Sequence, residues 1–217
     1  MNIQFLNADC MDPEVGLPSL ADNAFDLAIV DPPYGISQPA FRAKATTKLA
    51  APTNYNHSVF EQPAPDRTYF DELRRVSRNQ IIWGANYYNQ FLPAGNKWLF
   101  WDKGTEATRW GDGELAYTSF PGAITKIRFV WNGMLQGDMK HKECRIHPTQ
   151  KPVKLYQRLL NQFTNPGDLI LDTHVGSASS LIACQSMGFT YLGYELDPDY
   201  YAAAKRRMRA GVQKALL

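Results

Sequence analysis

Short apolar runs alternate with stretches of helical periodicity along this chain, which has 217 residues. Turn-forming residues bound the apolar runs, as they usually bound strands, while the longer stretches carry apolar residues at helical spacing. Strands are expected at residues 3–6, 25–30, 80–83, 98–101, 115–118, 127–131, 169–171 and 191–194. Helices are expected at residues 69–77, 153–163, 178–187 and 198–208. This alternation predicts an α/β fold, in which helices cover the faces of a sheet.

Two stretches interrupt the alternation and are interpreted as insertions into a single domain over residues 1–217. Residues 36–67 are rich in Pro, Ala, Thr, Asn and Gln, and they are too long for a structureless connection, which favours a functional loop. Residues 131–147 are loop-like and basic. One domain is the simplest count, because 44% hydrophobic residues can bury one sizeable core.

Composition excludes several classes of protein. The net charge of +2 neither requires nor excludes a nucleic-acid partner. Cys10, Cys144 and Cys184 are far apart, which argues against a disulfide framework or a zinc site and fits a reducing compartment. The N-terminal residues lack the pattern of a signal peptide, and no apolar run approaches the ~18 residues of a membrane span.

The tetrapeptide Asp31-Pro32-Pro33-Tyr34 directly follows the expected strand at residues 25–30. It places a carboxylate, a backbone carbonyl and an aromatic face at one point. Because the prolines fix the backbone, these groups can hold a planar exocyclic amino group with little reorganisation. The alternative is a stiff turn with a surface tyrosine.

A second set of residues surrounds the next two strand ends. Residues 172–178 form a turn of mostly small residues between a strand and a helix, where backbone N–H groups favour an anionic ligand group. Glu195 ends the following strand, where a ribose hydroxyl pair is gripped in nucleoside-binding sheets. For residues 172–178, the alternative is a tight structural turn without a ligand. For Asp197, which precedes the last helix, capping of that helix is preferred.

Two further motifs are ambiguous by themselves. Residues 147–152, His-Pro-Thr-Gln-Lys-Pro, are either a rigid connector or part of a site. Asp9 lies just past the first strand, where it either accepts a hydrogen bond from an adenine amino group or bonds to its own turn.

The order of these motifs resembles the amino-methyltransferases of DNA in the permuted β arrangement, with the catalytic half first and the cofactor half last. The resemblance covers nearly the whole chain, and several segments look most like small phage-type members. It implies a Rossmann-like S-adenosylmethionine-dependent methyltransferase fold, with a mostly parallel twisted sheet and helices on both faces. In this resemblance Asp9 contacts the cofactor adenine and Glu195 its ribose, while residues 172–177 surround its methionine part, with Thr149 and Lys151 nearby. The implied cofactor residues are Asp9, Cys10, Asp31, Thr149, Lys151, Asp172, Thr173, His174, Gly176, Ser177, Glu195 and Leu196.

The 172–178 turn departs from the family pattern, Asp-Pro-Phe-x-Gly-Ser-Gly. This chain has Thr173, His174 and Ala178 in place of Pro, Phe and the last Gly. Ala178 adds a methyl group where close approach is often needed. His174 is interpreted as a core-facing or hydrogen-bonded histidine, and no metal site is expected.

The resemblance implies methyl transfer to the N6 amino group of adenine in double-stranded DNA after base flipping, of the restriction–modification kind. The catalytic residues would be Asp31, Pro32, Pro33 and Tyr34. The Asp31 carboxylate and the Pro32 carbonyl would each accept one amino hydrogen, and Tyr34 would stack on the base. Asp at the first position resembles adenine-specific members more than cytosine-N4-specific ones.

Other functions remain open at this point: a cytosine-N4 methyltransferase, a protein-glutamine or RNA methyltransferase, and a catalytically silent DNA-binding relative. A homodimer and a cytoplasmic location are further expectations. Basic residues of the two insertions and the strand between them are candidates for DNA contact, with ordinary solvated surface as the alternative for each. These candidates are Arg42, Lys44, Lys48, Lys126, Arg128, Lys140, Lys142 and Arg145.

Overall fold

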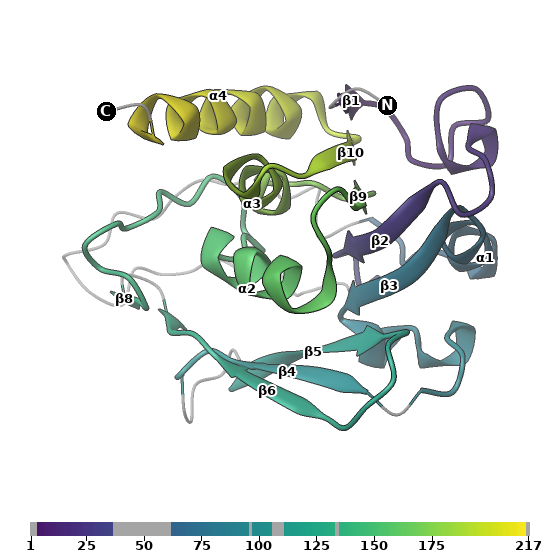
Figure 1. The fold of residues 1–217 in the computed structure, drawn as a ribbon, viewed down its shortest axis with the longest axis horizontal. Coiled ribbons are helices and arrows are strands. Elements are labelled where there is room, and N and C mark those ends of the chain that lie inside the picture. The colour runs from purple at the N-terminus through teal and green to yellow at the C-terminus, as the bar shows by residue number, and fades with distance from the viewer. Residues whose placement is uncertain (1–3, 37–61, 96, 106–110, 133–134, 216–217) are drawn as a thin grey trace.

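The computed structural model describes residues 4–36, 62–95, 97–105, 111–132 and 135–215. Within these residues one sheet has the strand order β1-β10-β9-β2-β3-β5-β4-β6 (Figure 1). Its strands are β1 Gln4–Asn7, β2 Phe25–Val30, β3 Ser77–Trp83, β4 Trp98–Asp102, β5 Gly113–Thr118, β6 Thr125–Arg128, β9 Leu169–Asp172 and β10 Thr190–Glu195. A separate hairpin joins β7 Trp131–Asn132 to β8 Leu135–Gln136.

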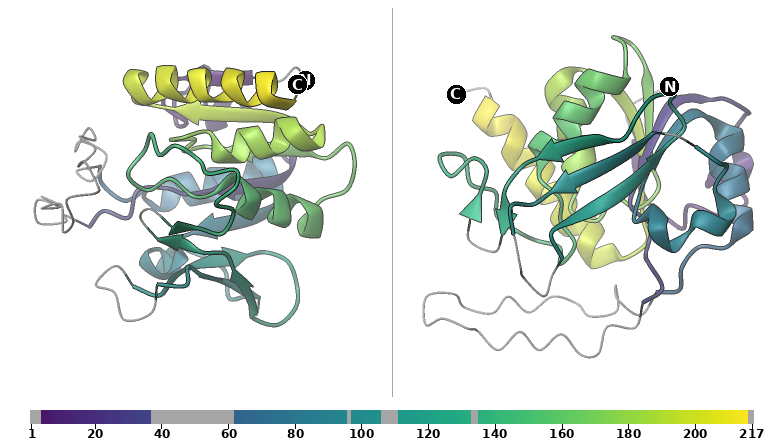
Figure 2. Two further views of the ribbon diagram at one scale, coloured as in Figure 1. Left: turned by 90° about the vertical axis from the view of Figure 1, so that its left-hand side faces the viewer. Right: turned by 90° about the horizontal axis from the view of Figure 1, so that it is seen from below.

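The helices cover both faces of the sheet (Figure 2). They are α1 Arg67–Val76, α2 Val153–Phe163, α3 Ser179–Met187 and α4 Pro198–Ala215, with short 3₁₀ turns η1 Leu17–Ser19, η3 Ala85–Tyr87 and η4 Asn89–Phe91. Strand β2 is buried on both sides: Leu27 and Ile29 pack in the cluster that contains α2, α3 and α4, while Ala28 and Val30 pack in the cluster that contains α1. Its unbroken apolar run reflects this double burial.

The sheet reverses its winding between β9 and β2. Strands β1, β10, β9, β2 and β3 are parallel, and β5 lies antiparallel between β3 and β4. From β9 the chain winds through β10, whereas from β2 it winds through β3 in the opposite direction. The carboxyl ends of parallel strands at such a reversal form a crevice in which ligands bind.

Most expected elements are present, although several of their bounds differ. The strand expected at residues 127–131 ends at Arg128, because the backbone then turns away and Trp131 begins the β7–β8 hairpin. That hairpin also shows that residues 131–147 are not wholly loop. The last helix continues beyond the expected end at residue 208 to Ala215. Residues 37–61 of the first insertion lie outside the described residues.

None of the helices in the described part of the chain is long and apolar enough to cross a membrane.

Candidate active site

A cavity lies at the carboxyl ends of β1, β2, β9 and β10, around the point where the winding reverses. Most of the residues that line it follow these strands or belong to the segment that leads into α2. They include Ala8–Cys10 after β1, Asp31–Ile36 after β2, Thr173–Ser177 after β9, Glu195 and Leu196 at the end of β10, and residues 147 and 149–151. Motifs that are far apart in the sequence therefore meet in one cavity.

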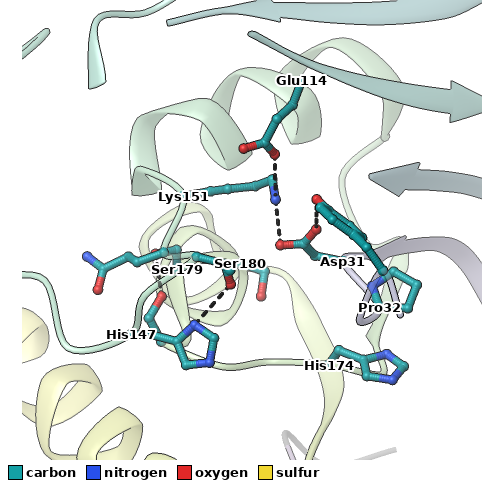
Figure 3. Close-up of polar contacts among 12 residues, drawn as sticks. Asp31, Pro32, Glu114, His147, Lys151, His174, Ser179 and Ser180 are labelled. Atoms are coloured by element: carbon teal, nitrogen blue, oxygen red, sulfur yellow. Dashed lines mark hydrogen bonds and ion pairs between the residues drawn. The ribbon is translucent and has the colours of Figure 1, made fainter. Parts of the chain in front are cut away.

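The Asp31 corner, residues 31–34, is held by side chains from other segments. The Oδ1 atom of Asp31 accepts a hydrogen bond from the Tyr34 hydroxyl at 3.0 Å, and Oδ2 accepts one from the Lys151 ammonium (Figure 3). Burial raises the pKa of the Asp31 carboxyl, while the ammonium of Lys151 opposes this rise. The Tyr88 hydroxyl lies 2.7 Å from the carbonyl oxygens of both Pro32 and Pro33. Each of these acceptors keeps a further lone pair for a substrate.

The ring of Tyr34 lies on another tyrosine. It stacks on Tyr87, with 4.8 Å between ring centroids and 16° between ring planes. Gly84 permits this position, because it has a φ of +66° and a Cβ there would lie 2.1 Å from Cε1 of Tyr34. Tyr87 itself is 42% exposed. The aromatic face expected from Tyr34 is therefore part of a pair.

Lys151 makes contacts that the sequence did not reveal. Its side chain is only 2% exposed, and its Nζ lies beside Asp31 and 2.9 Å from Oε2 of Glu114. Glu114 stands on β5, and its other oxygen pairs with Lys103. Although burial favours the neutral acid, Lys151 and Lys103 hold the pKa of Glu114 at about 2. The only sequence signal for Glu114 was a charged residue within an otherwise uncharged strand.

Asp172 holds the 172–178 turn in place through hydrogen bonds. This buried carboxylate accepts hydrogen bonds from the backbone N–H of His174, at 3.0 Å, and from the Ser180 hydroxyl. Burial raises the pKa of Asp172 to about 7. Asp172 does not line the cavity, unlike the other residues implied as cofactor-binding. Its oxygens are directed into the turn, and a contact between Asp172 and the cofactor stays a prediction.

The substituted positions of the turn have identifiable partners. Thr173 Oγ1 lies 2.6 Å from the Tyr69 hydroxyl and 2.9 Å from Nδ1 of His174. The interpretation of His174 as a hydrogen-bonded histidine is confirmed, and burial lowers its pKa to about 4. Ala178 has a φ of +62° and is fully buried. This left-handed conformation explains why glycine is the usual residue at this position in the resembling family.

Other carboxylates at the cavity are bound to backbone N–H groups. Glu195 accepts from Gly176 at 2.7 Å and from Asp197 at 2.9 Å, so it ties the end of β10 to the 172–178 turn. Asp197 accepts from the N–H groups of residues 199 and 200, which confirms its role as the cap of α4. Asp9 accepts from Met11 at 2.8 Å, as the turn interpretation predicted, and also lines the cavity.

The candidate DNA-contact residues are distributed unevenly. Arg42, Lys44 and Lys48 lie outside the described residues. Lys126 and Arg128 are exposed on β6, with Asp102 2.9 and 3.9 Å away, respectively.

The second insertion carries the remaining candidates. Lys140 and Lys142 are exposed, and the guanidinium of Arg145 lies 4.7 Å from the ring centroid of Trp131. Figure 1 shows this insertion on the side of the molecule toward which β2 and β3 point, which is the side of the cavity. Among the described residues, no three side chains suited to metal binding come together.

Comparisons with known proteins find similarity to DNA methylases. Residues 122–206 match the N6_N4 family of DNA methylases. The match includes residues 147–152, the 172–178 turn and Glu195, but not the Asp31 corner. The chain is 28% identical to a protein of Escherichia coli (strain K12) provisionally named methylase YubD, over 98% of this chain and 92% of that protein. It is 24% identical to the type II methyltransferase M.HpaI of Haemophilus parainfluenzae, over 92% and 73% of the two chains.

Solved structures show the same fold. The M1.HpyAVI–SAM complex matches with a TM-score of 0.58 and 20% identity, over 94% of this chain and 99% of the other. The cytosine-N4-specific PvuII DNA methyltransferase matches with a TM-score of 0.57 and 14% identity, over 98% and 91%. The expected Rossmann-like methyltransferase fold is therefore confirmed.

Proposed function

We propose that this protein transfers a methyl group from S-adenosylmethionine to the N6 amino group of adenine in double-stranded DNA. The observation that carries the proposal is the shared cavity: the Asp31 corner and the 172–178 turn face it together with Glu195. An amino-group site and a nucleoside site at one crevice are what methyl transfer to a base requires, because donor and acceptor must meet in line.

The residues present fit this cofactor. Glu195 places a carboxylate at the end of β10, where a ribose hydroxyl pair would bind, and Leu196 adds an apolar surface that is 56% exposed. The N-terminus of α3 directs backbone N–H groups toward an anionic group such as the methionine carboxylate. The relatives support the same cofactor, since M1.HpyAVI is described in complex with SAM. When bound, the sulfonium supplies an electrophilic methyl group.

The Asp31 corner would hold the target amino group. The carboxylate of Asp31 and the carbonyl of Pro32 each accept one amino hydrogen, which turns the nitrogen lone pair outward. A base that uses Oδ1 of Asp31 displaces the Tyr34 hydroxyl found there now, and the tyrosine ring is then available for stacking. The prolines keep the backbone of the corner in place, so only the Tyr34 side chain has to move when the base binds.

Nucleoside analysis tests the reaction and the target base together. Unmethylated DNA is incubated with the protein and S-adenosylmethionine, hydrolysed, and examined by mass spectrometry. N6-methyldeoxyadenosine is expected, because Asp31 resembles the adenine-specific pattern. N4-methyldeoxycytidine alone would replace the proposal with the reaction of the PvuII enzyme. Cofactor binding without either product would identify a silent relative.

We assign DNA contact to Lys140, Lys142 and Arg145 of the second insertion. Replacing all of them by Ala should weaken binding to duplex DNA and reduce the slope of log affinity against log salt by about 2–3, since each phosphate contact contributes about 0.9. The matched control replaces Lys205, Arg206 and Arg209 on α4, which removes the same charge from another surface. Equal slopes for the two triple variants would reject this assignment. A homodimer is a further expectation, which light scattering tests.

A further inference from the structure

Asp31 is one end of a row of four side chains whose charges alternate in sign. Next to Asp31 lies the Lys151 ammonium, then the Glu114 carboxylate at 2.9 Å, and then the Lys103 ammonium. Figure 3 shows Lys151 between the carboxylates of Glu114 and Asp31. Asp31 directly follows β2, Lys151 lies just before α2, Glu114 belongs to β5 and Lys103 directly follows β4, so only the tertiary fold brings these side chains together.

An aromatic ring lies beside each of the two ammonium groups. The Nζ of Lys151 lies 5.3 Å from the ring centroid of Trp83, and that of Lys103 lies 5.0 Å from Trp101. The two rings contact each other edge to face at 6.1 Å. Such an apolar wall excludes water and strengthens each charge interaction. The alternation of sign allows the row to be buried, because each charge has a neighbour of opposite sign.

Lysine alone would position Asp31 poorly. Its ammonium is a point charge on a flexible stem, so a single carboxylate partner leaves its place undetermined. Glu114 supplies a second partner on the far side of the ammonium, and Lys103 anchors Glu114 in turn. We infer that Glu114 is a positioning residue: it holds the Lys151 ammonium in place and thereby orients the Asp31 carboxylate that receives the target amino group. This inference rests on the proposed methyl transfer.

The row also sets the charge state of the site. Burial raises the pKa of Asp31 and Glu114 raises it further, while burial lowers the pKa of Lys151 but the two carboxylates outweigh this and raise it. Removing the Glu114 charge should therefore lower both pKa values. The other titratable and charged groups that face this pair are retained in such a variant, and they are Tyr34, Tyr88, Lys103, His147, Tyr156 and Asp172.

The test compares Glu114→Gln with Glu114→Asp. For Glu114→Gln we expect kcat to fall roughly 10- to 100-fold, as for other small misplacements of reacting groups, with KM for S-adenosylmethionine within about twofold. Both limbs of its pH profile should move to lower pH. Glu114→Asp keeps the charge but shortens the reach, so it should lower kcat and leave the pH profile in place. If Glu114→Gln does not fold, the comparison of Glu114→Asp with the wild type still tests the inference.

The matched control is Glu72→Gln, because Glu72 pairs with Arg75 on α1 and its side chain is as exposed as that of Glu114, at 23%. Its kcat should equal that of the wild type. Wild-type kcat in both Glu114 variants, or a loss in Glu114→Gln without a shift of the pH profile, would overturn the inference. A crystal structure of Glu114→Gln, with Lys151 displaced as expected, supports the network independently of turnover. A Lys151 side chain that is not displaced would refute the positioning role of Glu114. A wild-type protein that forms no methylated base would instead refute the proposed function.

Discussion

The carboxylates around the cavity are held in two different ways. Glu195 and Asp9 accept hydrogen bonds from backbone N–H groups, and Asp172 accepts from one backbone N–H and one hydroxyl. The bonds to Asp31 come from the hydroxyl of Tyr34 and the ammonium of Lys151. The proposed cofactor side is therefore held by main-chain turns, and the Asp31 corner by long side chains.

This difference suits the two tasks. A cofactor needs acceptors that stay in place while it binds and leaves. A carboxylate held by backbone N–H groups offers such a fixed acceptor at little cost in side-chain entropy. The Asp31 carboxylate instead has to exchange a partner when a base arrives, and the Tyr34 hydroxyl can leave while the Lys151 ammonium stays. We expect substitutions at Asp31 to affect turnover and substitutions on the cofactor side to affect binding.

The largest effect is expected for Asp31→Asn. The amide has the same shape but no charge, so it can no longer accept the amino hydrogen strongly, and kcat should fall by about 10²–10³ or more. Affinity for S-adenosylmethionine, measured by calorimetry, should change less than about threefold, because Asp31 contributes mainly to the base side of the cavity. Turnover comparable to the wild type would contradict the catalytic role.

Glu195→Ala should weaken cofactor binding by about 10- to 100-fold, as expected for a lost hydrogen bond to a charged group. It should also lower the free energy of unfolding by about 1–3 kcal/mol, since Gly176 and Asp197 lose their acceptor. The control is Asp197→Ala, which removes the cap of α4 at a cost of about 1 kcal/mol and should leave cofactor affinity intact. An unchanged dissociation constant for Glu195→Ala would reject the ribose assignment.

Asp172→Asn should change how stability depends on pH. Burial raises the pKa of Asp172 to about 7, whereas its ordinary value is 3.8. The folded state therefore binds more protons than the unfolded state between these values, and this group destabilises the fold as the pH rises from about 4 to about 7. The variant lacks this loss of stability. Its free energy of unfolding should therefore rise relative to that of the wild type by on the order of 1–3 kcal/mol across that pH range. Parallel stability curves from urea unfolding would contradict the raised pKa.

The same division explains what the sequence could predict. Strand β2 and helix α2 have the bounds expected from their apolar patterns, Phe25–Val30 and Val153–Phe163. The capping role of Asp197 and the turn role of Asp9 were also predictable. Each of these bonds joins residues two or three positions apart, so local chemistry determines it.

The contacts of the Asp31 corner were not predictable in this way. Lys151 lies 120 positions after Asp31, and Glu114 comes from a third segment. A resemblance between motifs placed Lys151 near the cofactor, but only the packing of β5 against β3 shows that it lies between two acids. The direction of Asp172 into the turn depends on Ser180, the second residue of α3, and was missed for the same reason.

The smallest effect is expected on the backbone-built side, at Ala178. A φ of +62° costs an alanine about 1–2 kcal/mol, whereas glycine adopts it freely. Glycine in turn lowers the free energy of unfolding by about 0.4–1 kcal/mol, because it gives the unfolded chain more conformational entropy. Ala178→Gly should therefore raise the free energy of unfolding by about 0.5–1 kcal/mol, as measured in urea. Ala183→Gly is the matched control, because Ala183 is equally buried but lies within α3. This variant should lower the free energy of unfolding by about 1 kcal/mol or more. A loss at both positions would mean that the packing of the buried Ala178 methyl group outweighs its backbone strain.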